Sequence, residues 1–488
     1  MSTGTSSCSL KIFLAGFIIL NLFLSSYFID AWLTPNAVSR AIPVLTLHEN
    51  GSLIIDKYKH ATRDRAFING HYYSDKAPLS TLLVYPFYTA YKSISTAPDS
   101  MDSFNKHPIY IWEENEIKDG RVFSFPEIKV PLVLGGFLCG SLPFTLLVTF
   151  IFIYIRKQQT GLPPVLLAML SAYGTFLFVL SGVYFGHLLS GLFLLVAYIF
   201  IKEGRNYFAA GFLIGLAFLT EYTTAIAGPI WLLLIFYNTR NFRKTMTFCL
   251  GALPAVLFIF YYNKITTGNM FDLLYNHVEV AGFSEMKTQF GFRLPSAEAM
   301  WGLLFSSYRG MFFYAPIFFL VAYHPIKNIL SAHGSKWKIS TNNYLLLFVA
   351  IYFLMISSYY MWWGGWSFGP RHLVPVAMLL LFEGIIYLSK IKFSRIIFFI
   401  FAVAGILIAW GGKATRVYMM PDDPSRFSNP LTSLILPDFA HHKFNANTLP
   451  TVLLDVSPQT SVYFWLFLFA LSVALLNKWY QNLAPRLL

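Results

Sequence analysis

The 488-residue sequence contains few charged residues, and this shortage restricts the class of protein. Only 12% of the residues are Asp, Glu, Lys or Arg, whereas a soluble domain carries about 25%. Hydrophobic residues make up 56%, and Phe (49) and Tyr (29) are abundant, as expected where aromatic side chains line both membrane interfaces. No polar stretch is long enough to form a separate soluble domain. The composition therefore predicts a polytopic membrane protein.

Cysteine and the familiar cofactor motifs are also scarce. The three cysteines, Cys8, Cys139 and Cys249, fall in predicted cytoplasmic or membrane segments, so no disulfide framework is expected. The chain has no GxxxxGKS/T loop and no GxGxxG after a strand, which leaves soluble nucleotide binding unsupported. It also lacks HExxH and CxxC motifs, and His441-His442 alone is weak evidence for a metal. We therefore predict no cofactor and no metal ligands, and a divalent metal has no support in the sequence.

Long hydrophobic runs, in contrast, recur along the whole chain. Their lengths approach or reach that of a membrane-spanning helix. We predict about twelve transmembrane helices, at Leu10–Asp30, Pro131–Tyr154, Pro163–Val183, Gly186–Ile201, Tyr207–Leu219, Thr224–Tyr237, Met246–Tyr262, Gly310–Tyr323, Tyr344–Met361, Leu373–Leu388, Ile396–Trp410 and Val462–Leu476. The shorter run Ala77–Tyr91 contains Pro86 and is interpreted as an interfacial or re-entrant helix.

The distribution of charge orients these helices. With the N-terminus in the cytoplasm, the inside segments hold a single acid, Glu203. The cations of the same segments are Lys11, Arg156, Lys157, Lys202, Arg205, Arg240, Arg243, Lys244, Lys327, Lys336, Lys338, Lys390, Lys392, Arg395, Lys478 and Arg486. Cytoplasmic loops are normally enriched in Lys and Arg. The net charge of +13 thus reflects topology and does not indicate nucleic-acid binding. We predict a multi-pass protein of the plasma (inner) membrane with both termini in the cytoplasm.

The fold predicted from these patterns is all-α, with a large extracytoplasmic first loop. This loop covers residues 31–130, and its segment Asn36–Leu47 reads as an amphipathic surface helix. We divide the chain into an N-terminal module, 1–262, and a C-terminal module, 263–488, whose outer loops are 263–309, 362–372 and 411–461. Outer loops are where an enzyme or receptor of this type keeps its function.

The first outer loop carries an acid–base pair next to aromatic residues, in the run Gly70-His71-Tyr72-Tyr73-Ser74-Asp75-Lys76-Ala77-Pro78. A carboxylate there can deprotonate an acceptor, and a cation can neutralise the phosphate of a lipid-linked donor. Asp75 and Asp64 are alternative candidates for the base, Lys76 is a candidate phosphate ligand, and Tyr73 is a candidate substrate contact. Charges in a loop are more often only solvated.

Two ionisable residues stand at the outer ends of predicted helices. His187 opens the fourth run and Glu221 follows the fifth. Ionisable groups at membrane depth are costly and are functional candidates by default. Glu221 is a third candidate for the catalytic carboxylate, and His187 is a candidate substrate contact, although a lone histidine is more often structural.

The short outer loop 362–372 concentrates tryptophan and glycine before a single cation, Arg371. Its guanidinium suits a phosphate because it offers two parallel donors. Trp363 and Trp366 are candidate contacts for a sugar or a polyprenyl chain, and their alternative role is interfacial anchoring. Arg309, at the mouth of the eighth run, is a further candidate for the donor phosphate.

These features together resemble the GT-C glycosyltransferase superfamily, in particular bacterial relatives of the protein mannosyltransferases and the lipid A aminoarabinose transferases. The resemblance lies in a single first span followed by a large outer loop, and in four local runs: residues 70–78, Gly215-Leu216-Ala217-Phe218-Leu219-Thr220-Glu221-Tyr222, Tyr308-Arg309-Gly310-Met311-Phe312-Phe313 and Trp363-Gly364-Gly365-Trp366-Ser367-Phe368-Gly369-Pro370-Arg371. The sequence departs from the family pattern in two places. No acid follows the first span, where Thr34-Pro35-Asn36-Ala37 stands, and Leu79 replaces the glycine common after Ala-Pro.

The resemblance implies an inverting transfer of a sugar from a polyprenyl-phosphate donor to an extracytoplasmic glycan, lipid or protein, with a first-loop carboxylate as the base. The alternatives are a lipid-linked saccharide flippase or transporter, and a non-catalytic envelope assembly protein. A transporter should carry ionisable residues near the middle of the bilayer, whereas nearly all acids here fall in outer loops. The sequence identifies neither the sugar nor the acceptor.

Overall fold

The computed structural model describes residues 2–29, 34–95, 126–158, 161–279, 285–286, 289–323, 341–415 and 429–486, and most of these residues are helical. The helices up to residue 267 are α1 (Ser2–Ser26), α2 (Pro35–Asn50), α3 (Leu79–Ile94), α4 (Lys129–Gly135), α5 (Leu142–Ile155), α6 (Pro164–Tyr173), α7 (Phe176–Val179), α8 (His187–Lys202), α9 (Tyr207–Thr220), α10 (Ala227–Thr239) and α11 (Phe242–Thr267). The later helices are α12 (Ala297–Leu304), α13 (Met311–Tyr314), α15 (Thr341–Ser357), α16 (Val374–Leu388), α17 (Arg395–Ala414), α18 (Leu436–Ala440), α19 (Leu449–Leu454) and α20 (Pro458–Leu483). One hairpin, β1 (Arg65–Ile68) and β2 (His71–Ser74), completes the described fold.

Helical segments overlap each of the twelve predicted apolar runs, which confirms a mostly helical chain of membrane-protein character. Six helical stretches are long and apolar enough to cross a membrane: Cys8–Ser26, Lys129–Ile155, Phe242–Thr267, Arg371–Leu388, Arg395–Ala414 and Pro458–Leu483. The second of them joins α4 to α5 through a π-helical turn, Gly136–Ser141. The other predicted spans coincide with shorter helices, so a total of twelve crossings stays a prediction.

Two of the predicted runs are broken rather than continuous. The run Pro163–Val183 is divided into α6 and α7, and helix α13 ends at Tyr314, short of the end of the run Gly310–Tyr323. The first break lies where α17 crosses very closely. A Cβ atom on Gly405 of α17 would lie 2.2 Å from the carbonyl oxygen of Gly174, at the end of α6. Only glycine permits this approach of the two backbones.

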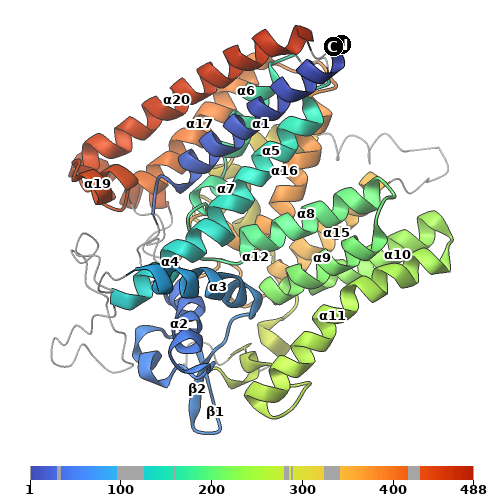
Figure 1. Ribbon diagram of the computed structural model, residues 1–488, viewed down its shortest axis with the longest axis vertical. Coiled ribbons are helices and arrows are strands. Elements are labelled where there is room, and N and C mark those ends of the chain that lie inside the picture. Colours follow the sequence, from blue (N-terminus) through green and yellow to red (C-terminus); the bar gives the residue numbers. More distant parts are fainter. Residues whose placement is uncertain are drawn as a thin grey trace.

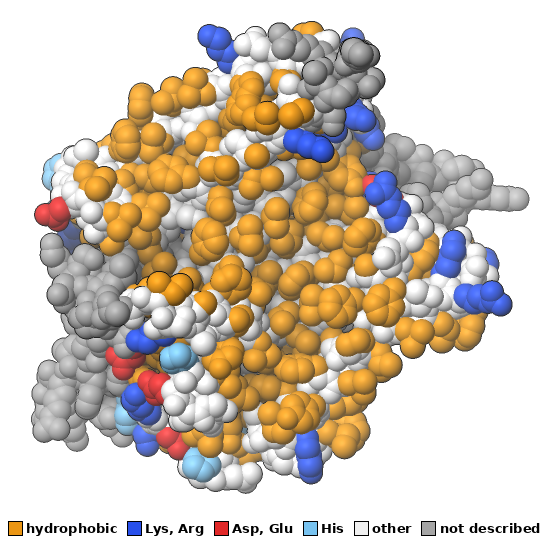
Figure 2. Space-filling view, in the orientation of Figure 1, with side chains coloured by type: hydrophobic (Ala, Val, Ile, Leu, Met, Phe, Trp, Pro, Cys, Tyr) orange, Lys and Arg blue, Asp and Glu red, His pale blue; other side chains and the backbone are white. Residues whose placement is uncertain are grey.

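The two ends of the molecule differ in character. Helices α1 and α20 lie side by side and bring both termini to one end, while the hairpin and α2 occupy the region farthest from them (Figure 1). Figure 2 shows a broad hydrophobic face between these ends, with Lys and Arg along its upper and right-hand margins and a mixture of Asp, Glu, His, Lys and Arg at the lower left. This surface suits a membrane-embedded protein. The inside and outside assignment remains a prediction, and Lys327, Lys336 and Lys338, on which it partly depends, lie outside the described residues.

Helices α2 and α3 and the hairpin lie in the described part of the predicted first outer loop. The predicted helix Asn36–Leu47 is confirmed as α2, which begins at a Thr34 cap and ends at Gly51 in the left-handed conformation (φ 67°). All residues from Ala37 to Thr46 are buried. The exposed face expected of an amphipathic surface helix is therefore wrong, because α3, α4 and β2 pack around this helix. Its position relative to the membrane surface stays a prediction.

The predicted interfacial helix Ala77–Tyr91 corresponds to α3, whereas the hairpin between α2 and α3 is absent from the predicted fold. The hairpin turns at Asn69-Gly70, both with positive φ (50° and 86°). An Asn-Gly pair between apolar and aromatic residues is a strong hairpin signal, so the sequence did contain the evidence for this element. Residues 96–125 of the same loop and 416–428 of the loop 411–461 lie outside the described residues.

Candidate functional site

The hairpin brings the two candidate bases of the first loop together. Its antiparallel register pairs Arg65 with Ser74, so the next residues outward, Asp64 and Asp75, leave the base of the hairpin on opposite strands. Lys76 follows directly and contacts both carboxylates, with its Nζ 2.8 Å from Asp64 Oδ2 and 3.1 Å from Asp75 Oδ2. All three side chains are buried.

Burial acts on these groups in opposite ways. It raises the pKa of Asp75 above that of an ordinary carboxyl group, and Lys76 opposes this shift. Burial lowers the pKa of the Lys76 amine, but the carboxylates of Asp64 and Asp75 outweigh it, so the pKa of Lys76 is raised. Lys76 is therefore a fixed positive charge between the carboxyl groups of Asp64 and Asp75.

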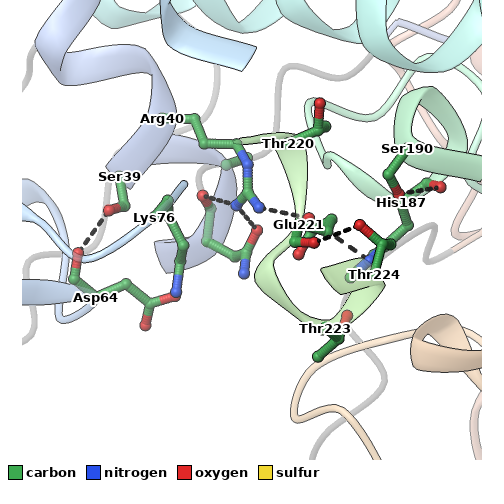
Figure 3. A network of polar contacts seen from close by, with 12 residues as sticks. Ser39, Arg40, Asp64, Lys76, His187, Ser190, Thr220, Glu221, Thr223 and Thr224 are labelled. Carbon is green, nitrogen blue, oxygen red and sulfur yellow. Dashed lines mark hydrogen bonds and ion pairs between the residues drawn. The ribbon is translucent and has the colours of Figure 1, made fainter. Parts of the chain in front are cut away.

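Helix α2 connects this triad with a second carboxylate. Ser39 donates a hydrogen bond to the carbonyl oxygen of Asp64 (2.6 Å) and lies 3.3 Å from Asp75 Oδ1. The next residue, Arg40, points the other way and places its Nη2 2.6 Å from Glu221 Oε1. Figure 3 shows Arg40 between the Asp64–Lys76 pair and Glu221. Two adjacent residues of one buried helix thus hold both acidic centres in place.

Glu221 and His187 meet at the ends of α9 and α8. Glu221 follows the last residue of α9 in an extended conformation, and His187 is the first residue of α8. His187 Nδ1 lies 3.5 Å from Glu221 Oε1. A Cβ atom on Gly186 would lie 2.5 Å from the same oxygen, so the glycine before His187 leaves room for the carboxylate.

The loop 362–372 delivers Arg371 to the same place. Arg371 is buried, its guanidinium lies over the Phe185 ring (5.1 Å to the centroid), and it interacts electrostatically with Asp64 and Glu221. Gly364 has a φ of 78°, and a Cβ atom there would lie 3.0 Å from Arg371 Cγ and Nε. This glycine therefore lets the loop fold back over the arginine.

We define the polar cluster as Arg40, Asp64, Asp75, Lys76, His187, Glu221 and Arg371. Its members come from the first outer loop, from the ends of α8 and α9, and from the loop 362–372. Several buried atoms of the cluster and its surroundings have no hydrogen-bond partner among the described residues: Arg40 Nε, His187 Nε2, Arg371 Nε and His372 Nε2. Buried polar groups are normally paired, and each exception requires an explanation. A polar or anionic ligand that binds here would provide one.

Two of the predicted phosphate ligands have other partners. Arg309 is fully buried, and its guanidinium donates to the backbone carbonyls of Tyr308 (2.9 Å), Trp363 (3.0 Å) and Gly365 (3.0 Å). It braces the loop 362–372 instead of facing the polar cluster with free donors. Lys76 belongs to the cluster, but it is held by two carboxylates. Arg371 differs from these two predicted phosphate ligands. Its Nε is buried and has no hydrogen-bond partner in the described part of the chain.

The predicted aromatic contacts are more dispersed. Tyr73 lies on β2 and packs against an apolar cluster that includes Ala66, Leu219 and Tyr262. Trp363 packs edge-on against Trp362 (5.8 Å between centroids), and its Nε1 is buried without a partner among the described residues. Trp366 is half-buried in the same loop. The roles of these three side chains as substrate contacts stay predictions.

Sequence reasoning missed two contributors, Arg40 and His372. Arg40 is the sole charged residue between Asn36 and Leu47, and a single cation within an apolar helix was the available signal. The His372 ring packs edge-on against the ring of His187 (5.6 Å), a contact between residues 185 positions apart that no local pattern reveals. Within the described residues, no group of three or more His, Cys, Asp or Glu side chains is placed to hold a metal ion.

No family model matches the chain, and no curated protein or solved structure is significantly similar to it.

Proposed function

We propose that this protein is an integral-membrane glycosyltransferase that moves a sugar from a polyprenyl-phosphate donor to an acceptor on the outer side of the membrane. The observation that supports this proposal most strongly is the convergence of two first-loop carboxylates, Glu221 and Arg371 in one buried cluster. A lipid-linked phosphate donor needs this combination of a base and a cation at one place.

Asp64 is the base in this proposal, because its carboxylate is the more accessible of the two. The side chain of Asp64 is 11% exposed, against 1% for Asp75. Both oxygens of Asp75 already have neighbours, Ser39 at 3.3 Å and Lys76 at 3.1 Å. A base must reach the proton that it removes, so geometry takes precedence over proton affinity. Lys76 and Asp75 then act as positioning residues for Asp64.

The reaction is a single displacement with inversion. Asp64 accepts the proton of an acceptor hydroxyl, whose oxygen forms a bond to the anomeric carbon while the bond from that carbon to the phosphate oxygen breaks. The electron pair leaves with the polyprenyl phosphate, and Arg371 stabilises the negative charge that develops on it. No general acid is needed, since a phosphate is a good leaving group once its charge is neutralised.

Topology and partners follow from the same proposal. The polar cluster lies on the outer side of the inner membrane, both termini are cytoplasmic, and the acceptor is a glycan, lipid or protein outside the cell membrane. Cysteine labelling with a membrane-impermeant maleimide tests this orientation. A cysteine placed at Lys443 should react in intact cells, whereas one placed at Lys336 should not, and the reverse result would overturn the topology.

The activity is tested with purified protein, polyprenyl phosphates that carry radiolabelled sugars, and membrane extract as the source of acceptors. The expected result is transfer by the wild-type protein and its near-complete loss in Asp64→Asn. Asp56→Asn is the matched control, because Asp56 is also an outer-loop carboxylate but pairs with His71 away from the cluster. If saccharide crosses the membrane without any turnover of the donor, the protein is a transporter and the proposal is wrong.

A further inference from the structure

The ion pair between Arg40 and Glu221 has a neighbour that the displacement mechanism does not use. His187 is 5% exposed, and its two ring nitrogens have different surroundings. Nδ1 lies 3.5 Å from Glu221 Oε1, while Nε2 is buried and has no hydrogen-bond partner among the described residues. A buried nitrogen without a partner, beside a substrate site, indicates a ligand atom.

The surroundings of Nδ1 decide the chemistry of Nε2. A carboxylate beside Nδ1 favours the tautomer with its proton on that nitrogen. Arg40 already provides the positive charge opposite Glu221, at 2.6 Å, so the ring does not need to become a cation to balance it. In a neutral ring with the proton on Nδ1, Nε2 carries a lone pair and can only accept a hydrogen bond.

Local structure fixes the ring in this orientation. His187 is the first residue of α8, and its ring packs edge-on against Phe185 (5.8 Å) and His372 (5.6 Å). Thr220 and Glu221 lie directly against Gly186. The position of Nε2 is therefore set by the start of α8, the end of α9 and the loop 362–372. A site that discriminates between ligands requires such a fixed position.

We propose that Arg40, Glu221 and His187 form a relay in which Arg40 holds Glu221, Glu221 sets the tautomer of His187, and His187 Nε2 accepts a hydrogen bond from a hydroxyl of the substrate. For the identity of that hydroxyl, on the donor sugar or on the acceptor, the inference rests on the proposed function. His187 thereby becomes a specificity-determining residue. A ligand that lacks the hydroxyl leaves Nε2 buried and unpaired and is bound less well.

Two substitutions of nearly the same chemistry separate the two nitrogens. The side-chain amide of His187→Asn reaches the position of Nδ1 but leaves that of Nε2 empty, whereas the amide of His187→Gln extends to Nε2. We expect kcat/KM to fall on the order of 10-fold in the Asn variant, which corresponds to the loss of about one hydrogen bond. In the Gln variant it should fall by no more than about 3-fold. His48→Asn, a substitution outside the cluster, serves as the control. Equal activities of the Asn variant and the wild type would contradict the relay.

Ligand-induced thermal stabilisation identifies the source of the hydroxyl. If it belongs to the donor sugar, His187→Asn reduces the stabilisation by a polyprenyl-phosphate sugar but not that by the bare polyprenyl phosphate. If it belongs to the acceptor, both stabilisations are kept and the KM for the acceptor rises. If the stabilisations and this KM all match those of the wild type, the relay is wrong.

The tautomer can be measured without any enzymatic activity. The ¹⁵N resonances of labelled histidine distinguish protonation at Nδ1 from protonation at Nε2, and His187→Gln identifies the His187 signals by their loss. The relay predicts a proton on Nδ1 in the wild-type protein and loss of this preference in Glu221→Gln. A proton on Nε2, or on both nitrogens, in the wild type would overturn the relay. Absence of sugar transfer together with the predicted tautomer would instead reject the proposed function and leave the relay standing.

Discussion

Two buried arginines contact the loop 362–372 in contrasting ways. Arg309 donates to three backbone carbonyls and stacks on Tyr308 (3.9 Å to the ring centroid). Arg371 belongs to the same loop, but its Nε is buried without a partner among the described residues, and it interacts electrostatically with Asp64 and Glu221. The sequence offers both as candidate phosphate ligands. The contrast shows that the partners of a buried cation, and not its type, separate a structural brace from a binding site.

The largest expected effect follows from removing the proposed base, Asp64, which interacts electrostatically with Arg371. Asp64→Asn keeps the shape of the side chain but cannot accept the proton of the acceptor, so transfer should fall roughly 10²–10⁴-fold. Initial rates with radiolabelled donor measure this change, and expression and donor binding should remain close to those of the wild type. If Asp75→Asn is inactive while Asp64→Asn is active, the roles assigned to the two carboxylates must be exchanged.

Parallel substitutions of the two arginines test the contrast directly. Arg309→Lys leaves up to three buried carbonyls unpaired, at a cost of about 1–3 kcal/mol each, and should lower the free energy of unfolding by several kcal/mol. Arg371→Lys replaces a fork with a point charge, so the unfolding free energy should change little while donor affinity falls about 10-fold. Chemical unfolding in detergent and titration with donor measure the two quantities. Identical profiles for both variants would remove the distinction between brace and binding site.

The protonation of Asp75 predicts a pH dependence of stability. Burial raises the pKa of this carboxyl in the folded protein, although Lys76 opposes the shift. In the folded protein the Asp75 carboxyl therefore keeps its proton above about pH 4, where the same carboxyl in the unfolded chain releases it. The contribution of Asp75 to the free energy of unfolding is complete below about pH 4. It is lost as the pH rises through the pKa of this carboxyl in the folded protein.

Asp75→Asn cannot titrate and should lack this part of the slope, which amounts to at most about 1.4 kcal/mol per pH unit. Free energies of unfolding measured for both proteins between pH 4 and pH 8 provide the comparison. Equal slopes would show that the carboxyl is ionised in the folded state throughout this range.

The smallest effect is expected near the turn of the hairpin, where His71 contacts Asp56. Asp56 Oδ2 lies 2.8 Å from His71 Nδ1, but the two side chains are 40% and 49% exposed. Exposed pairs contribute about 0–1 kcal/mol, so Asp56→Asn should leave both unfolding and transfer nearly unchanged. A large loss of transfer in this variant would extend the site beyond the polar cluster and weaken the comparison on which the other predictions depend.

Local patterns in the sequence were sufficient for most helices but insufficient for the contacts. The apolar runs predicted a helical membrane protein, and the candidates Asp64, Asp75, Lys76, Glu221, His187 and Arg371 are together in the polar cluster. The hairpin is missing from the predicted fold, although the pair Asn69-Gly70 is a local signal for a hairpin turn. The break between α6 and α7 depends on a neighbouring helix, α17, which lies more than 200 residues away in the chain, so local pattern could not indicate it.

By itself, the sequence determined the helical, membrane-embedded character of this protein, because hydrophobicity and its run length are local properties. It also identified which residues are chemically able to act. The tertiary structure alone decided that Arg40 pairs with Glu221, that Lys76 lies between two acids, and that Arg309 braces a loop while Arg371 faces the cluster. These pairings join residues up to about 300 positions apart. They are set by how helices pack, and no periodicity along the chain records them.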